Sequence, residues 1–465
     1  MMALRKSVEK AAEIVKEHAY ARVISHYDAD GITSAGIICN ALLRRDIQFH
    51  TTIVSKLDRS FIQGLDEDLI IFCDMGTAQS DLIMEYLNKK DVIIIDHHVP
   101  LAAPPISLES SVVLINPSSS RTDEERGMEN EIGDGICAAG LSYLMARCMA
   151  DDKKANLDLA GLAVAGTLGD KLELNKGINK LIVDEAIKEG VISVKKGLKL
   201  GDGKIRELML FSTEPYIPLA GKGEWVDAFL SKVGIDGDKN VSDLGKGEEK
   251  RLSDALFSLL QEHNPEISEG ALVGTTYILN SEVIRNGLNF MRMVDACGRL
   301  GNSSIGIGLC LREENLVEAA NSLYLTFQSK LVSELNRIES EKGAIKELQN
   351  IFYFFVHERG VTGVLAGIVA EYLYTGKTVI VVNKQDRAEE GKVAETKLSA
   401  RCNKKLLAVS KGIDLAQAME KASREVGGVG GGHPVAAGAS IPEGAEEKFI
   451  AALDRIIGEQ AGRIS

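Results

Sequence analysis

The segment "VIIIDHHVP", Val92–Pro100, decides the fold. Its four β-branched residues carry no charge, which is typical of a strand buried on both faces, and such strands belong to parallel sheets covered by helices. The apolar run ends in an acid followed by two adjacent histidines. The segment therefore predicts a buried strand that presents chemically active side chains at its carboxyl end.

Two earlier segments repeat this plan. "ARVISHYDADGITSAGIICNALLRR" (Ala21–Arg45) is an apolar run, a polar turn and a helix that we expect to begin near Thr33. "DLIIFCDMG" (Asp68–Gly76) is another buried strand that ends in an acid. The alternation of strands and helices predicts an α/β fold with a parallel sheet. Ligands bind such sheets at the carboxyl ends of the strands, so we expect one site that collects Asp28, Asp30, Asp74, Asp96, His97 and His98.

These acids and histidines predict a metal centre. Taken singly, each Asp is better explained as a turn former or a helix N-cap than as a ligand. Carboxylates gathered at one edge repel one another, however, and a divalent cation relieves this repulsion. Oxygen ligands with imidazole suit Mn²⁺ or Mg²⁺. We also expect the carboxylates of Asp28 and Asp30 to point to the same side of an extended segment.

Composition excludes several classes of protein. The 465 residues suffice for two or three domains. A net charge of −13 argues against a general nucleic-acid coat protein, although a local basic channel stays compatible with it. The 7 Cys form no CxxC pair, which predicts a reducing cytoplasm and neither a zinc finger nor a disulfide framework. We expect a cytoplasmic protein without signal peptide or membrane contact, because no long apolar segment is present.

Seven motifs in order resemble one superfamily. "SHYDADGITSA" (Ser25–Ala35), "FCDMG" (Phe72–Gly76), "DHH" (Asp96–His98) and "GTLGD" (Gly166–Asp170) are similar to the motifs of the DHH phosphoesterases. The later motifs resemble the RecJ branch, namely "VDACGRLGNSSIGIGLCL" (Val294–Leu311), "HERGVTGVLAGIVAEYLY" (His357–Tyr374) and "GGVGGGHPVAAGASI" (Gly427–Ile441). Residues 175–285 match no motif in this way.

The resemblance implies a parallel-sheet DHH catalytic domain and a smaller α/β DHH-associated substrate-binding domain, joined by a long helix. The expected ranges are 1–200 and 286–315 for the catalytic domain, 201–285 for an inserted subdomain, 316–350 for the linker helix and 351–465 for the substrate-binding domain. The apolar spacing of the linker predicts about ten helical turns at roughly 3.6 residues per turn. The insert resembles that of archaeal RecJ-like proteins, which implies association with the GINS complex of the replisome. The alternative is that Trp225 and Phe229 only fill the core of the insert.

The resemblance also implies the roles of the site residues. The expected ligands of two divalent cations, Mn²⁺ favoured and Mg²⁺ possible, are Asp28, Asp30, Asp74, His97 and Asp170. Asp74 would bridge the cations and His98 would face the scissile phosphate, which makes both catalytic. His26 stands where bacterial RecJ usually has an acid, so its status as a ligand stays open. Asp134, in "GDG" (Gly133–Gly135), is a competing acid that we expect to cap the next helix.

The implied substrate-binding residues are Arg299, His357, Ser399, Arg401, Gly430, Gly431, Gly432 and His433. Gly427–Gly432 holds five glycines in six positions, and we expect a loop whose backbone approaches phosphates. A helix C-cap followed by a flexible turn is the alternative.

The resemblance therefore implies a two-metal phosphodiesterase that acts as a single-strand-specific exonuclease in DNA replication or repair. Digestion from 5′ to 3′ and DNA as substrate are favoured, and RNA stays open. The alternatives are a small-substrate phosphodiesterase for nanoRNA or dinucleotides, a 3′ to 5′ exonuclease of the same family, and a replisome scaffold with a decayed active site. The last fits poorly with a chain that keeps every acid and histidine of the motifs.

Overall fold

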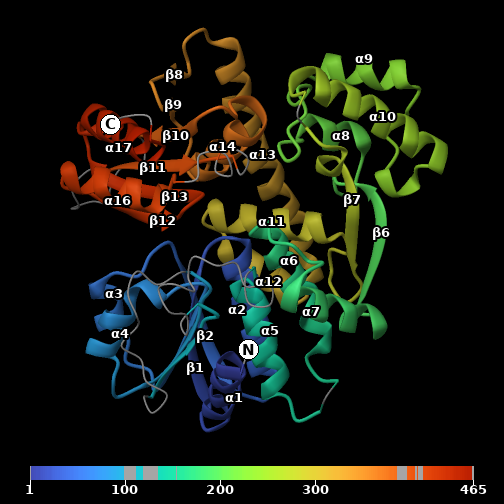
Figure 1. The fold of residues 1–465 in the computed structure, drawn as a ribbon. Helices are drawn as coiled ribbons and strands as arrows, with labels where there is room; N and C mark the ends of the chain where they lie inside the picture. Colours follow the sequence, from blue (N-terminus) through green and yellow to red (C-terminus); the bar gives the residue numbers. More distant parts are fainter. Residues whose placement is uncertain are drawn as a thin grey trace. The chain divides into compact units, whose positions relative to one another are not determined.

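The computed structural model describes residues 2–98, 111–118, 135–152, 154–265, 267–384, 395–403, 406 and 412–462. Two compact units divide the chain, one formed by residues 1–201 with 273–324 and the other by residues 202–272 with 325–465. The colours of Figure 1 follow the chain through both units. The domain ranges drawn from the sequence remain predictions. Among the described residues, no helix is both long and apolar enough to cross a membrane.

A parallel sheet forms the centre of the first unit, as the sequence predicted. Its five strands lie in the order β2-β1-β3-β4-β5, with parallel pairing throughout. Val92–Ile95 of β4 are fully buried, which explains their uncharged character. The strands are β1 (Tyr20–His26), β2 (Gln48–Val54), β3 (Leu69–Cys73), β4 (Asp91–Ile95) and β5 (Val112–Ile115).

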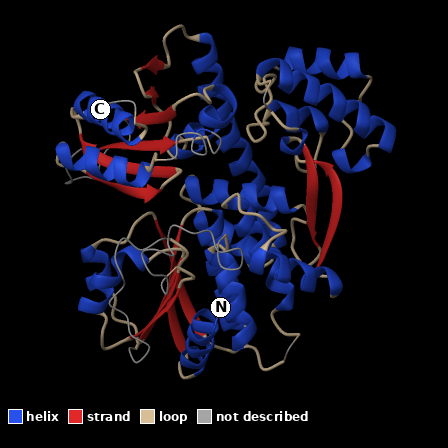
Figure 2. Cartoon of the chain, in the orientation of Figure 1, coloured by secondary structure: helices blue, strands red, loops and turns tan. Residues whose placement is uncertain are grey.

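Helices cover both faces of this sheet, because alternate strand residues enter two separate cores (Figure 2). Ile93 and Ile95 pack with α1, α2, α5 and α6, whereas Val92 and Ile94 pack with α3 and α4. These helices are α1 (Met2–Lys16), α2 (Ala29–Leu43), α3 (Arg59–Gln63), α4 (Ser80–Tyr86), α5 (Ala138–Met149) and α6 (Ala160–Gly169). The unit is completed by α7 (Gly177–Lys188), the antiparallel pair β6 (Ile192–Leu198) and β7 (Val273–Leu279), α11 (Gly287–Arg299) and α12 (Ser303–Cys310).

In the second unit, residues 202–272 pack against the later part of a long helix, α13 (Val317–Ser340), which belongs to this unit from Leu325 onward. The Tyr216 hydroxyl donates to Glu339 Oε1 at 2.7 Å. The sequence predicted that this helix would continue to Asn350, but it ends at Ser340 and the chain turns at Gly343, whose φ is 86°. Trp225 is 66% exposed, which contradicts the alternative that it fills the core of the insert. The other helices of this segment are α8 (Ile205–Leu210), α9 (Gly223–Val233) and α10 (Lys246–His263).

The rest of the second unit is a smaller α/β domain, which confirms the predicted fold class. Its six-stranded sheet has the order β12-β13-β11-β10-β9-β8. The strands are β8 (Lys346–Glu347), β9 (Ile351–Val356), β10 (Thr378–Asn383), β11 (Glu395–Arg401), β12 (Val429–His433) and β13 (Ala436–Pro442). The helices are α14 (Thr362–Ile368), which continues as a π-helical turn (Val369–Leu373), α16 (Leu415–Glu425) and α17 (Glu446–Gln460).

The glycine run is not only a loop, which corrects the sequence prediction. Residues Val429–His433 form β12, the edge strand of the second sheet. A Cβ at Gly430 would lie 2.5 Å from the carbonyl oxygen of Met419 in α16, and one at Gly432 would lie 2.7 Å from the carbonyl oxygen of Ala436. Two of these glycines are therefore required by close packing as well as by any role in binding.

Candidate metal centre

Side chains from four segments of the first unit meet beyond the carboxyl ends of its strands. His26 is the last residue of β1, Asp74 follows β3, and His97 follows β4. Asp28 is the N-cap of α2, and Asp170 is the C-cap of α6. Asp134 lies outside the described residues, and the N-cap of α5 is Cys137.

The two carboxylates of "DAD" do not share one extended segment, so that expectation is wrong. Asp28 has extended backbone angles (φ −82°, ψ −176°), and its side chain accepts from the Gly31 N–H as the N-cap of α2. The helix thus begins at Ala29 rather than near Thr33, and Asp30 lies in its first turn. Asp30 is directed to the start of α5, where its carboxylate accepts the N–H groups of Ala138 and Ala139 at 2.8 Å each.

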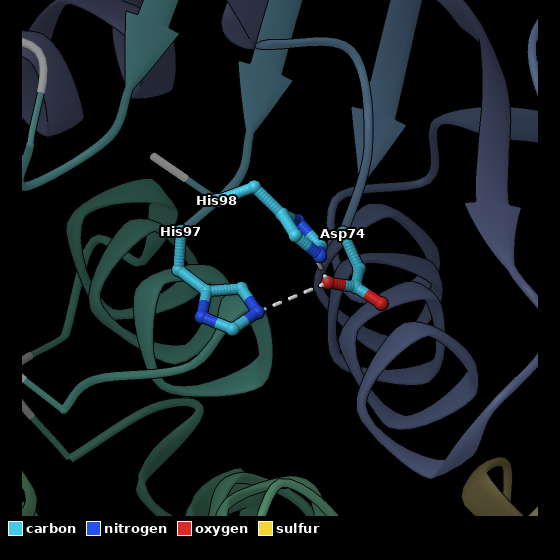
Figure 3. Close-up of side chains that lie close together, drawn as sticks. All are labelled: Asp74, His97 and His98. Atoms are coloured by element: carbon cyan, nitrogen blue, oxygen red, sulfur yellow. Dashed lines mark ion pairs between the residues drawn. The ribbon is translucent and has the colours of Figure 1, made fainter. Parts of the chain in front are cut away.

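Asp74 is shared by two groups of potential ligands. In the first group, His26 Nδ1 lies 2.9 Å from Asp28 Oδ2 and 3.4 Å from Asp74 Oδ2. In the second, His97 Nε2 lies 3.3 Å from Asp74 Oδ1, and His98 Nδ1 lies 3.9 Å from the same oxygen. Figure 3 shows both imidazoles approaching the Asp74 carboxylate. Asp74 has a positive φ of 57°, an uncommon conformation that is found mostly where the surroundings require it.

The second group extends to two more acids. His97 Nε2 lies 3.3 Å from Asp170 Oδ2 and 3.8 Å from Asp30 Oδ2. Burial, followed by the charge of Asp74, raises the pKa of Asp30 to about 6. Burial, followed by the charge of Asp30, holds the pKa of Asp170 well above its usual range. These carboxylates therefore repel one another in the absence of a cation.

The donor atoms fit the divalent cations that the resemblance implies. Asp74 Oδ1 and Asp170 Oδ2 are buried and have no hydrogen-bond partner among the described residues. Buried polar atoms without a partner are rare in proteins and require an explanation such as a bound ion. Carboxylate oxygens with imidazole nitrogens form a set that suits Mn²⁺ or Mg²⁺. Burial lowers the pKa of His26, but the neighbouring Asp28 outweighs this effect and raises it overall.

Asp96 holds the two histidines in place. Its Oδ1 accepts the backbone N–H groups of His97 at 2.8 Å and His98 at 3.1 Å, and it lies 2.7 Å from His98 Nδ1. Its Oδ2 accepts the Thr77 N–H at 2.9 Å. Burial lowers the pKa of His98, but the Asp96 carboxylate outweighs burial and raises it. The acid in "DHH" therefore orients the histidines and favours the protonated form of the His98 imidazole.

Sequence reasoning missed a support behind the "DAD" turn. Asp295 in α11 accepts the Ala29 N–H at 3.3 Å through Oδ1, and its Oδ2 lies 2.5 Å from Arg299 Nε. A Cβ at Gly298 would lie 1.6 Å from the Tyr27 carbonyl oxygen, so only glycine allows this approach of helix and turn. Arg299, expected to bind substrate, is paired with Asp295 and only 18% exposed. In the sequence, the one signal of this support was Gly298, a glycine within a segment of otherwise helical pattern.

The second unit places most of its predicted substrate residues on one sheet. Arg401 of β11 pairs with Ala436 of β13, which pairs with His433 of β12. Directly paired residues share a face of the sheet, so Arg401 and His433 lie on the same face. Ser399 and Gly431, two residues earlier in their strands and both paired with Gly438, lie on that face as well. Gly430 and Gly432 belong to the opposite face.

His357 lies just beyond the end of β9 rather than on the sheet. It follows Val356, which pairs with Asn383 at the end of β10, whereas Arg401 pairs with Val379 near the start of β10. The pairing therefore does not place His357 in the row that holds Arg401 and His433.

Comparison with known proteins gives consistent matches along the chain. Residues 21–167 match the DHH family, N-terminal domain, and residues 348–459 match the DHHA1 domain. The chain is 33% identical to an uncharacterized protein of Methanocaldococcus jannaschii over 100% of both chains. It is 26% identical over 208 residues to the single-stranded-DNA-specific exonuclease RecJ of Thermus thermophilus. The aligned segment covers 42% of this chain and 29% of that protein.

The fold is similar to those of two solved structures. RecJ of Thermus thermophilus in complex with Mn²⁺ superposes with a TM-score of 0.58 and 19% identity, over 99% of this chain and 55% of that chain. CDC45 from Entamoeba histolytica superposes with a TM-score of 0.66 and 11% identity, over 97% and 99% of the two chains. The chain spans about half the length of the RecJ structure.

Proposed function

The chain belongs to the DHH superfamily, in its RecJ-like branch, and from this premise we propose that it is a two-metal phosphodiesterase that degrades single-stranded nucleic acid from a free end. DNA is the favoured substrate and 5′ to 3′ the favoured direction, in DNA replication or repair. The observation that carries the proposal is the position of Asp74 between two groups of potential ligands. Two buried oxygens there, Asp74 Oδ1 and Asp170 Oδ2, have no hydrogen-bond partner within the described part of the chain.

The ligand assignment follows from these two groups. His26, Asp28 and Asp74 would hold one cation, and Asp30, His97 and Asp170 with Asp74 would hold the other. Mn²⁺ is favoured and Mg²⁺ is possible, and the short distance from His26 Nδ1 to Asp28 Oδ2, 2.9 Å, supports His26 as a ligand. Two such cations, when bound, lower the pKa of a shared water and stabilise charge on the phosphoryl oxygens.

His98 would act on the substrate itself. Its side chain is 41% exposed, whereas the Asp96 carboxylate behind it is only 2% exposed. Asp96 fixes Nδ1 and raises the pKa of His98, which favours the protonated imidazole, whose Nε2–H would donate to a phosphoryl oxygen. A donor fixed in this way stabilises the charge that develops during hydrolysis.

The second unit would bind the polymer. Arg401, Ser399 and His433 offer a guanidinium, a hydroxyl and an imidazole on one sheet face, and these groups suit phosphate oxygens. A Cβ at Gly431 would meet no atom within 4 Å, so a ligand can approach its backbone closely. Arg299 and His357 remain candidates for additional phosphate contacts.

A replisome partner is part of the proposal. Trp225 is 66% exposed on α9, and an exposed Trp beside half-buried Phe229 supports docking of a protein through residues 202–272. The proposed partner is the GINS complex. Trp225→Ala should weaken co-elution with purified GINS without changing Mn²⁺-dependent hydrolysis, and unchanged co-elution would contradict the assignment of this surface.

Digestion of a long, end-labelled single DNA strand beside a dinucleotide tests the proposal against the small-substrate alternative. With Mn²⁺, the long strand should be degraded stepwise and the dinucleotide should be the poorer substrate. Efficient cleavage of the dinucleotide with no digestion of the long strand would favour a small-substrate phosphodiesterase. A 3′ label and a 5′ label on the same strand distinguish the two directions.

A further inference from the structure

A third group of potential ligands contains a cysteine that the proposed function does not use. The ligand atoms of Asp30, Cys137 and Asp170 lie within 4.8 Å of one another. Cys137 is the N-cap residue of α5, is fully buried, and is far along the chain from every motif acid. Its Sγ lies 3.5 Å from the Thr167 hydroxyl, a weak contact between neutral groups.

The same place receives a histidine and an oxygen that needs a partner. His97 Nε2 lies 3.3 Å from Asp170 Oδ2 and 3.8 Å from Asp30 Oδ2. Asp170 Oδ2 is buried without a hydrogen-bond partner among the described residues. The Cys137 sulfur thus lies with two carboxylates of the proposed second cation site, Asp30 and Asp170, and the His97 imidazole approaches the same two carboxylates.

This combination of donors is selective. Zn²⁺ binds four ligands drawn from Cys, His and Asp in tetrahedral sites, whereas Mn²⁺ and Mg²⁺ prefer oxygen. We propose that Cys137 is a sulfur ligand which thiophilic divalent cations, Zn²⁺ and Co²⁺, recruit at this position and which Mn²⁺ leaves unused. The cation displaces the thiol proton to solvent when the metal–sulfur bond forms.

The expected consequence is competition. Zn²⁺ and Co²⁺ bind mixed nitrogen, oxygen and sulfur sites more tightly than Mn²⁺ does, and the thiolate adds to this preference. If His97 or Asp74 supplies the fourth ligand beside Asp30, Cys137 and Asp170, a tetrahedral ion would have no open position for substrate. Zn²⁺ should therefore displace Mn²⁺ from this half of the centre and inhibit hydrolysis. This inference rests on the proposed metal centre, so its test must separate the two.

Absorption spectroscopy of the full chain titrated with Co²⁺ provides that separation. The wild type should show tetrahedral Co²⁺ bands together with a sulfur-to-cobalt charge-transfer band, and Cys137→Ser should lose the charge-transfer band. Cys148, at the other end of α5, offers the matched control, and Cys148→Ser should keep the band. A band that persists in Cys137→Ser, or Co²⁺ binding without any charge-transfer band, would overturn the role of Cys137 and leave the metal centre standing. Failure of the wild type to bind Co²⁺ at all would overturn the centre itself.

A second measurement needs no variant. X-ray absorption of the Zn²⁺-loaded wild type should contain a sulfur shell at about 2.3 Å beside nitrogen and oxygen neighbours at about 2.0–2.2 Å. A shell of nitrogen and oxygen only would contradict the proposal, whatever the behaviour of Cys137→Ser.

Discussion

Replacing Asp96 with Asn separates the orientation of the histidines from cation binding. Asp96 is buried and accepts from three backbone N–H groups, those of Thr77, His97 and His98. Asn has a single carbonyl oxygen. Its NH2 group must therefore face either the Thr77 N–H or the donors of the two histidines. The hydrogen bond from the Thr77 N–H is lost in the first case and those from the His97 and His98 N–H groups in the second, and the remaining ones become neutral.

The magnitude follows from these bonds. Loss of one hydrogen bond to a charged group costs about 1.5–3 kcal/mol, and at least one is lost, so the free energy of unfolding should fall by that amount or more. Because Asp96 sets the position of a proposed ligand, His97, we expect roughly 10- to 100-fold weaker Mn²⁺ binding or hydrolysis. The negative charge of Asp96 raises the pKa of His98, so its removal should shift the loss of activity at high pH toward lower pH.

Calorimetric titration with Mn²⁺, thermal unfolding and a pH profile of hydrolysis measure these three effects. Asp91→Asn is the matched control, because Asp91 begins the same strand at the end away from the centre, and its Oδ2 lies 2.9 Å from His18 Nε2. That variant should leave Mn²⁺ affinity unchanged. If Asp96→Asn binds Mn²⁺ as tightly as the wild type does and its pH profile is not shifted, the role assigned to Asp96 is refuted.

Three further predictions concern the centre and the second unit. Asp74→Ala should abolish hydrolysis while circular dichroism stays unchanged, because no nearby carboxylate can replace a bridging one; substantial activity at saturating Mn²⁺ would contradict this, and Asp134→Ala should be milder. Burial and the charge of Asp74 raise the pKa of Asp30 to about 6, so below that pH a cation must displace the Asp30 proton. Mn²⁺ affinity measured by calorimetry should therefore rise as the pH increases through about 6, and an affinity independent of pH would contradict this. His433→Ala should slow digestion of a long strand more than of a dinucleotide, with single-strand binding that weakens in salt; equal loss on both substrates would assign His433 to catalysis.

The parallel sheet and the meeting of its polar strand ends could be predicted from the sequence. The short uncharged runs in β3 and β4 are typical of strands buried on both faces. The carboxyl ends of parallel strands lie at the same edge of the sheet. The positions of Asp74 and His97 follow from that geometry. The resemblance to known motifs added Asp170, which follows a helix and has no strand to mark it.

The remaining features depend on contacts between distant segments. Whether α2 begins at Ala29 or near Thr33 is settled by Asp28 as N-cap and by Asp295, more than 260 positions later, at the Ala29 N–H. The glycines of β12 have low strand propensity, and only packing against α16 makes that strand evident. Cys137 lies beside Asp30 because the N-terminus of α5 meets the Asp30 carboxylate, and no local sequence pattern indicates this proximity.

The most direct test of the account compares a linear single-stranded DNA with a covalently closed circle of the same sequence, incubated with Mn²⁺ and with either the wild type or Asp74→Ala. The account predicts that the wild type degrades the linear strand to mononucleotides and leaves the circle intact, and that Asp74→Ala degrades neither. Wild-type protein that binds Mn²⁺ but leaves the linear strand intact would contradict the proposed hydrolysis, and rapid cutting of the circle would contradict the requirement for a free end.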